Sequence, residues 1–211
     1  MEFHNPRRLP PTLLDAVLAS GPQTRMLRYL CRAGGSHTGR AIGKAANLSH
    51  TAASRALRPL AMLGVVDAEP QGRAILYRLN EDHWIVQEGL LPLFRAEARF
   101  HAHLGEAIRE AAGRAVRSVI LFGSEARGEA RIDSDLDVAC LTAAASARAG
   151  AEAGLVDAAS RLRRRFGRRV TILVWPAAEF ARRYRLRDRL IREIVETGWV
   201  IDGAPLSEVL R

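Results

Sequence analysis

The sequence contains little cysteine and no long apolar run. Its 2 cysteines, Cys31 and Cys140, lie far apart between apolar neighbours, which is typical of small buried hydrophobic residues and not of a disulfide or a metal-binding pair. No apolar stretch approaches the roughly 20 residues that a membrane-spanning helix needs. The first ten residues contain two arginines but lack the apolar core of a secretory signal. These absences predict a cytoplasmic protein with no membrane partner.

Lysine is almost missing as well. All but one of the 32 basic residues are arginine, the exception being Lys44, and they face 23 acidic residues, which gives a net charge of +9. An excess of this size favours a polyanionic partner, either nucleic acid, a nucleotide or an acidic lipid. The use of arginine in place of lysine is explained by the base composition of the genome as well as by such a partner. With 48% apolar and 26% charged residues, the chain is expected to fold and not to remain disordered.

The chain changes character near residue 85, and the part before it has helical and then strand patterns. Apolar spacing, together with the capping residues Thr38 and Ser49, predicts short helices separated by tight turns. Two β-rich runs around a proline and a glycine then predict a hairpin. The expected elements are helices over 12–19, 23–31, 38–46 and 50–62, and strands over 65–69 and 74–79.

This order of elements resembles the winged helix-turn-helix of bacterial transcriptional regulators, over about residues 12–83. The segments that carry the resemblance are Ala41 to Leu57, Leu63 to Val66 and Gly72 to Asn80. Asn47 stands where the turn of this family often has glycine, and asparagine can replace it because it tolerates a left-handed backbone. Pro59 lies inside the helix over 50–62, which we expect it to kink beyond the N-terminal turns.

The resemblance implies contacts with double-stranded DNA. Side chains in the first turns of the helix over 50–62 would reach base edges, and basic residues around it would contact phosphates. The residues implied are His50, Thr51, Ser54 and Arg55 for the bases, and Arg40, Lys44, Arg58 and Arg73 for the phosphates. The absence of acidic residues from Arg40 to Val66 favours this interpretation over a solvated face or a winged helix that contacts only protein. Because a single winged helix usually binds DNA weakly, we also expect a homodimer.

An apolar stripe along residues 86–112 predicts a linking helix. This helix either joins the two halves of the chain or pairs with a second copy. The expected division is a DNA-binding domain over 1–85, the linking helix over 86–112 and a second domain over 113–211.

The part after residue 112 combines a glycine-serine turn with two aspartates. Gly123 and Ser124 follow a buried strand, and after ten intervening residues Asp135 and Asp137 begin another strand. Aspartates two apart on a strand point to the same face. The expected elements are strands over 116–122, 135–141, 169–175 and 199–203, and a helix over 149–166.

These residue types suit a nucleoside triphosphate with its metal ion. A glycine lets the backbone approach a phosphate closely, the amides at a helix start attract the anion, and a serine hydroxyl adds a donor. Two carboxylates can hold Mg²⁺ against the phosphates, because hard cations prefer oxygen ligands. The metal then assists in-line attack on the α-phosphate by neutralising the charge that develops.

The order and spacing of these residues resemble the minimal nucleotidyltransferases of the DNA polymerase β superfamily, over about residues 98–203. The resemblance implies Mg²⁺-dependent transfer of a nucleoside monophosphate from an NTP to a hydroxyl, with release of pyrophosphate. The residues implied are Asp135 and Asp137 as catalytic metal ligands, and Gly123, Ser124, Arg127 and Ser134 as nucleotide-binding residues.

One position departs from the pattern of this family. The family normally has a third carboxylate on a later strand, and the matching position here is Thr171. A threonine neither takes up a proton near neutral pH nor holds Mg²⁺ as a carboxylate does. Glu179, just past that strand, would substitute only if its helix bent back. Nucleotide binding is therefore expected, and turnover stays open.

The sequence thus predicts an α+β protein, with an N-terminal winged helix-turn-helix and a C-terminal nucleotidyltransferase-type α/β domain with a mixed sheet. We interpret it as a DNA-binding transcriptional regulator whose second domain binds Mg²⁺–NTP and either transfers NMP or responds to the nucleotide. The alternative is an antitoxin-type nucleotidyltransferase that modifies a protein or small molecule, with the winged helix docking the target. A third interpretation is a non-specific nucleic-acid binder. Two arginine runs, over 161–169 and 182–192, fit a triphosphate, a nucleic-acid backbone or a solvated face.

Overall fold

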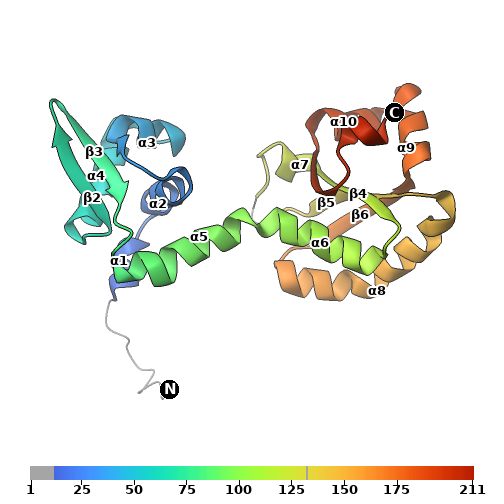
Figure 1. Cartoon of the computed structure of the whole chain (residues 1–211), viewed down its shortest axis with the longest axis horizontal. Helices are drawn as coiled ribbons and strands as arrows, with labels where there is room; N and C mark the ends of the chain where they lie inside the picture. Colours follow the sequence, from blue (N-terminus) through green and yellow to red (C-terminus); the bar gives the residue numbers. More distant parts are fainter. Residues whose placement is uncertain (1–11, 132) are drawn as a thin grey trace, which may run out of the picture. The chain divides into compact units, whose positions relative to one another are not determined.

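The chain divides into two compact units, Met1–Ala98 and Arg99–Arg211 (Figure 1). The computed structural model describes residues 12–131 and 133–211, so the first ten residues, for which no secretory signal is expected, lie outside the described residues. Within these two ranges, no helix is both long enough and apolar enough to cross a membrane. Each unit has its own hydrophobic core.

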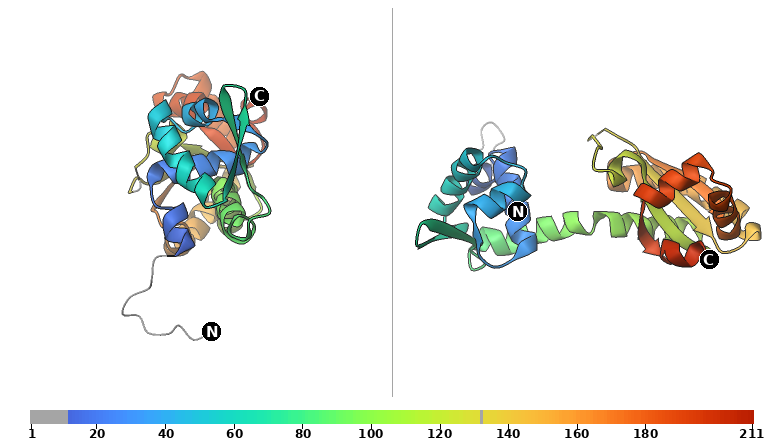
Figure 2. Two further views of the ribbon diagram at one scale, coloured as in Figure 1. Left: turned by 90° about the vertical axis from the view of Figure 1, so that its left-hand side faces the viewer. Right: turned by 90° about the horizontal axis from the view of Figure 1, so that it is seen from above.

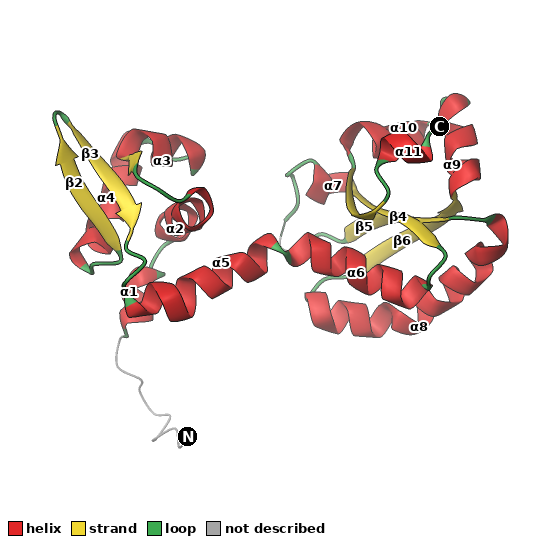
Figure 3. Cartoon of the chain, viewed as in Figure 1, coloured by secondary structure: helices red, strands yellow, loops and turns green. Residues whose placement is uncertain are grey.

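The first unit contains short helices and a three-stranded antiparallel sheet in the order β1-β3-β2 (Figure 3). Its elements are α1 Leu13–Val17, α2 Gly21–Ala33, β1 His37–Thr38, α3 Gly39–Ala45, α4 His50–Met62, β2 Val66–Gln71, β3 Ala74–Leu79 and α5 Leu91–Ala98. The expected helices and both hairpin strands are present, with ends that move by up to two residues. Strand β1 was not predicted, because its two residues form a strand only by pairing with Leu76 and Tyr77 of β3.

Local hydrogen bonds explain where the helices of this unit begin. The hydroxyls of Thr38 and Ser49 each accept a backbone N–H at 3.2 Å, from Ala41 and Ala52, and so cap α3 and α4 as expected. Helix α4 continues through Pro59 to Met62, so this proline does not end the helix. Helices α2, α3 and α4 supply large, fully buried members of one core, namely Met26, Leu27, Leu30, Ile42, Leu57 and Leu60.

The turn between α3 and α4 is tight. Asn47 has a φ of 52°, the left-handed conformation that the sequence led us to expect at this position. A β-carbon on Gly43 of α3 would lie 3.0 Å from that of Ala53 on α4. The two helices thus approach each other closely because one of them has no side chain at the contact.

The hairpin ends in a loop of two residues, Gly72 and Arg73, because Gln71 pairs with Ala74. This loop is shorter than the expected turn over 70–73. Gly72 has a φ of 59°, which suits a hairpin turn that starts with glycine. Pro70 is part of β2, where the missing N–H is tolerated because β2 is an edge strand. The hairpin projects from the helices as a two-stranded arm (Figure 2).

Residues 86–112 do not form one continuous linking helix. They form a π-helical turn Val86–Leu90, α5 and α6 Phe100–Ala112. Pro92 lacks the N–H that would bond to the carbonyl of Glu88, and such a loss accompanies irregular helical turns. Arg99, with φ −91° and ψ 0°, stands in a turn between α5 and α6, and the two compact units are divided at this residue.

The second unit is built on a four-stranded sheet in the order β6-β5-β4-β7. Strands β5 and β6 are parallel and the other two pairs are antiparallel, so the sheet is mixed, as predicted. Besides α6, its elements are β4 Val116–Phe122, α7 Gly123–Ala126, β5 Leu136–Thr142, a 3₁₀ turn Ala145–Ala147, α8 Arg148–Phe166, β6 Val170–Pro176, α9 Ala177–Arg185, α10 Arg189–Thr197, β7 Trp199–Gly203 and α11 Leu206–Val209.

Helices cover both faces of this sheet (Figure 1). Leu104 of α6 and Leu155 of α8 pack on one face, in the same cluster as Val138 of β5. Phe180 of α9 and Ile194 of α10 pack on the other face. Strands β5 and β6 begin one residue later than predicted, so the first of the two expected aspartates lies just before its strand.

Candidate functional site

Two aspartates and a threonine meet at one end of the mixed sheet. In the sheet, Asp137 of β5 pairs with Phe122 of β4 on one side and with Thr171 of β6 on the other. Its side chain lies on the α9 and α10 face, because its neighbour Val138 belongs to the cluster on the opposite face. The Thr171 hydroxyl donates to Oδ2 of Asp135 at 3.4 Å. The end of the sheet therefore presents two carboxylates side by side.

Gly123 closes this site from the side of β4. It has a φ of 73°, and a β-carbon on it would overlap the carboxylate of Asp137. A glycine is thus needed here for two reasons, its left-handed backbone and the close approach of the aspartate. Ser124 follows at the start of α7 and is half-buried. The turn that starts at Gly123 is consequently packed directly against the carboxylate of Asp137.

Burial raises the pKa of Asp137, and the negative charge of Asp135 raises it further. The positive charge of Arg127 acts in the opposite direction, and the carboxylate of Glu193 adds to the increase. Carboxylates that repel one another are stabilised in their ionised form by a cation. The electrostatics of the site therefore favour binding of a metal ion.

Arg127 is engaged by two carboxylates. Its Nε lies 2.9 Å from Oε2 of Glu129, and its Nη1 lies 2.8 Å from Oε1 of Glu193 on α10. These contacts raise the pKa of Arg127, with the hydrogen bond to Glu129 as the first cause. Sequence reasoning missed Glu193, because it lies in an arginine-rich stretch and reaches the site only through the packing of α10. Arg127 thus links the loop after α7 to α10, and its charge acts on Asp137.

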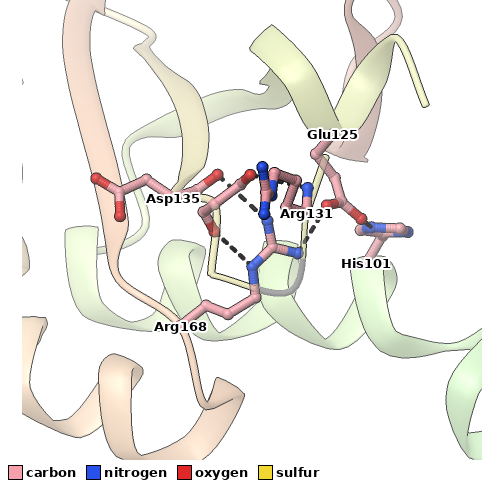
Figure 4. A network of polar contacts seen from close by, with 6 residues as sticks. His101, Glu125, Arg131, Asp135 and Arg168 are labelled. Atoms are coloured by element: carbon pink, nitrogen blue, oxygen red, sulfur yellow. Dashed lines mark hydrogen bonds and ion pairs between the residues drawn. The ribbon is translucent and has the colours of Figure 1, made fainter. Parts of the chain in front are cut away.

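A polar network fixes the loop that leads to the aspartates (Figure 4). Arg168 donates from Nη1 to Oε2 of Glu125 at 2.7 Å, from Nε to the carbonyl of Ser134 at 2.7 Å and from Nη2 to the carbonyl of Asp135 at 3.3 Å. His101 of α6 contacts the other oxygen of Glu125 at 3.1 Å. The side chain of Arg168 is only 17% exposed. One arginine, which the sequence suggested only as part of a basic run, therefore holds α7 to the start of β5.

Ser134 belongs to the same loop. Its hydroxyl accepts the N–H of Arg131 at 2.9 Å, and its carbonyl accepts from Arg168. In this structure the hydroxyl and the carbonyl of Ser134 both stabilise the conformation of the loop. The expected contact of Ser134 with a nucleotide remains a prediction.

Within residues 12–131 and 133–211, no three acidic, histidine or cysteine side chains form a cluster that could hold a metal ion. Glu179 does not complete the site, because its carboxylate lies 3.7 Å from Nη1 of Arg148. Two carboxylates nevertheless fit Mg²⁺, which is commonly held by one or two of them together with phosphate oxygens and water. The donor set of Asp135 and Asp137 is of this kind.

In the first unit, four of the predicted DNA-binding residues surround one groove of about 490 Å³. The groove lies between α3, the start of α4 and the hairpin, and it is lined by Arg40, His50, Ser54 and Arg73, together with Thr38, Gly39, Ala74, Ile75 and Tyr77. Lys44 lines a neighbouring pocket that also includes Arg40 and His50. These residues come from three elements, and the fold brings them together.

The other predicted residues lie around α4. Thr51 and Arg55 line a pocket on the side of Ser20 and Pro22, and Arg58 is exposed one turn further along the helix. Among the described residues of this unit, the ion pairs of carboxylates are made with Arg28, Arg32 and Arg78. The predicted basic residues are therefore available for an anionic partner.

Comparison with known proteins identifies part of the second unit. Residues 104–200 match the family model of the nucleotidyltransferase domain, and Gly123, Asp135 and Asp137 lie within the match. One solved structure that the chain resembles is titled "Crystal structure of the toxin-antitoxin with AMP-PNP". The identity is 20%, the TM-score is 0.35, and the match covers 52% of this chain and 78% of that chain. No curated protein matches the chain. Residues 104–200 are accordingly a nucleotidyltransferase domain.

Proposed function

We propose that the protein is a DNA-binding transcriptional regulator whose nucleotidyltransferase domain binds Mg²⁺–NTP. The observation that carries the proposed nucleotide binding is the close approach of Gly123 to the carboxylate of Asp137, within the matched domain. The proposed DNA binding is supported by the groove that Arg40, His50, Ser54 and Arg73 line.

In the nucleotide site, the aspartates and the glycine-serine turn would have different roles. Asp135 and Asp137 would hold Mg²⁺, and the backbone at Gly123 with the Ser124 hydroxyl would bind the β- and γ-phosphates. The metal supplies charge neutralisation on the triphosphate. Thr171 holds the carboxylate of Asp135 by a hydrogen bond and cannot accept a proton from an attacking hydroxyl. Transfer of NMP is therefore expected to be slow compared with binding.

In the first unit, α2, α3, α4 and the hairpin would act as a winged helix-turn-helix with α4 as the recognition helix. His50 and Ser54 would reach base edges from the groove, with Thr51 and Arg55 beside them. The basic residues would neutralise phosphates and set the orientation on the duplex. A homodimer with two such units would bind two half-sites of a palindromic sequence.

The proposed nucleotide binding is tested with the double variant Asp135→Ala/Asp137→Ala. Each α-labelled NTP is titrated into the full-length protein with and without Mg²⁺. Wild-type protein should bind in an Mg²⁺-dependent manner, and the variant should lose this binding while its affinity for DNA changes by less than about twofold. Equal loss of both activities would refute the separate roles of the two units.

A second candidate is an enzyme that transfers NMP to a protein or small molecule, with the first unit docking the target. It is favoured by the presence of two aspartates side by side at the end of the sheet. Incubation of the protein with labelled NTP and cell extract distinguishes the two candidates. Label transfer and pyrophosphate release that disappear in the double variant would establish the enzyme. Nucleotide binding without turnover, together with salt-sensitive binding to a specific duplex, would establish the regulator.

A further inference from the structure

A nine-residue surface on the second unit combines exposed apolar side chains with unneutralised charge. It runs over residues 182–190, from the last turn of α9 to the first turn of α10, and is called the 182–190 surface. Tyr184 is 36% exposed, Leu186 is 71% exposed and Leu190 is 36% exposed. The surface also contains five arginines and one aspartate, a net charge of +4.

The charges of this surface are mostly without a partner. Among the described residues, the aspartate, Asp188, pairs with Arg183 at 2.7 Å. The ion pairs found within residues 99–131 and 133–211 include none of the other arginines of this surface, which are Arg182, Arg185, Arg187 and Arg189. All four are exposed. Four guanidinium groups thus flank the apolar side chains, and none of the four forms an ion pair within the part of the chain that the structure describes.

The turn that carries these side chains is well fixed. Asp188 caps α10 by accepting the N–H of Ile191 at 3.2 Å, and Arg183 holds its other oxygen. The backbone N–H groups of Leu186 and Arg187 donate to carbonyls of α9 at 3.1 and 3.0 Å. Arg187 has a φ of 60°, a conformation that a residue other than glycine keeps only where its surroundings impose it. Leu186 is therefore displayed in one position, which reduces the entropy cost of binding a partner.

The C-terminal end of the 182–190 surface lies one helical turn before Glu193, which belongs to the surroundings of the candidate nucleotide site. Arg189 and Glu193 are four residues apart on α10, so their side chains are neighbours on the helix. Glu193 bonds to Arg127 beside Asp137. A partner bound on the 182–190 surface would consequently lie next to that site.

We propose that the 182–190 surface docks a protein segment that presents carboxylates around an apolar side chain. Charge complementarity requires an acidic partner, and the exposed leucines require an apolar contact at its centre. Tyr184 could stack on a base, but the most exposed apolar side chain, Leu186, and its neighbour Leu190 are aliphatic and offer a nucleic acid no stacking surface. The leucines therefore favour a protein over a nucleic acid. A second copy of this chain is disfavoured as the occupant of this surface, because the same surface on the copy has a net charge of +4 and would bring like charges together.

The proposal is tested by selecting displayed random peptides of about 16 residues on the full-length protein. The expected peptides are rich in aspartate and glutamate around a leucine or phenylalanine. Their affinity should fall about tenfold or more for Leu186→Ser, as for a residue at the centre of an interface. Val156 of α8, which is 74% exposed, provides the matched control, and Val156→Ser should leave the affinity within about twofold.

Three results would overturn the proposal. One is a set of selected peptides without acidic enrichment, and a second is an equal loss of affinity in Leu186→Ser and Val156→Ser. The third is competition by single-stranded RNA or by anionic lipid vesicles that equals competition by the selected peptides. Peptide binding should persist in Asp135→Ala/Asp137→Ala, so failure of the proposed nucleotide function does not affect the outcome.

Discussion

The α-carbon of Gly123 lies so close to the carboxylate of Asp137 that no β-carbon fits between them. The glycine belongs to the turn after β4 and the aspartate to the neighbouring strand β5. Because Phe122 and Asp137 pair directly in the sheet, the contact is set by the strand register. The two features that suggest a phosphate-binding turn and a metal ligand are therefore parts of one structural unit.

The substitution Gly123→Ala should abolish Mg²⁺-dependent NTP binding, because the new methyl group displaces the Asp137 carboxylate. A left-handed backbone also costs about 1–3 kcal/mol for a residue other than glycine. Gly128 is the matched control, since it has a φ of 72° but open space around its α-carbon. Gly128→Ala should lower stability similarly and keep NTP binding. Equal NTP affinity of Gly123→Ala and wild type, measured by calorimetry, would contradict this role.

The substitution Arg168→Gln should destabilise the second unit by about 3 kcal/mol, as expected when one partner of a largely buried ion pair is removed. It should also weaken NTP binding, because the backbone of Asp135 loses its hydrogen bond. Arg161→Gln, at an exposed position of α8, is the control and should change stability by less than about 0.5 kcal/mol. Urea unfolding followed by circular dichroism measures both values. A stability change as small as that of the control would rule out a supporting role for Arg168.

The stability of the second unit should depend on pH through Glu125. Burial alone would raise the pKa of Glu125, but the hydrogen bonds from Arg168 and His101 outweigh it, and the net pKa is lowered from the ordinary value of 4.5. A carboxyl group with a lowered pKa stabilises the fold above its unfolded pKa, and this contribution disappears as the pH falls through the folded pKa. The difference in unfolding free energy between wild type and Glu125→Gln should thus shrink as the pH falls below the ordinary pKa of 4.5. A difference that does not change down to about pH 3 would show that Glu125 has no such effect.

The substitution Arg73→Ala should weaken DNA binding for all duplex sequences alike. Arg73 is exposed at the tip of the hairpin and lines the groove with His50, so it is placed to contact a phosphate. Loss of one phosphate contact lowers the slope of log affinity against log salt by about 1. Arg78→Ala is the control, because Arg78 already pairs with Asp67 at 2.9 Å. Fluorescence anisotropy at several salt concentrations measures the slope, and an unchanged slope for Arg73→Ala would exclude the contact.

Patterns local in the sequence predicted most of the secondary structure. Alternating and helical spacings gave the strands of the mixed sheet to within one residue, and the cap at Ser49 gave the start of α4. Asn47 adopts the left-handed backbone that its side chain allows. Such features depend on neighbouring residues, so they can be recognised without a tertiary structure.

Features that depend on distant contacts were not predicted. Strand β1 exists only through its pairing with β3, and Arg168 gains its function from Glu125 and from two carbonyls of another loop. Glu193 reaches Arg127 only because α10 packs against β4, with Ile120 and Ile194 in one cluster. The break of the linking segment at Arg99 likewise has no marker in the apolar stripe that predicted a continuous helix.

Gly123, Asp137, Thr171 and Glu193 come from four elements, α7, β5, β6 and α10, and they meet only when the second unit is folded. A nucleotide held there would bind the native state and not the unfolded chain. By mass action it would add about 2.7 kcal/mol of stability at a free concentration one hundred times its dissociation constant. The cellular supply of NTP would then protect the unit Arg99–Arg211 from unfolding and proteolysis, and the lifetime of the protein would follow the energy state of the cell.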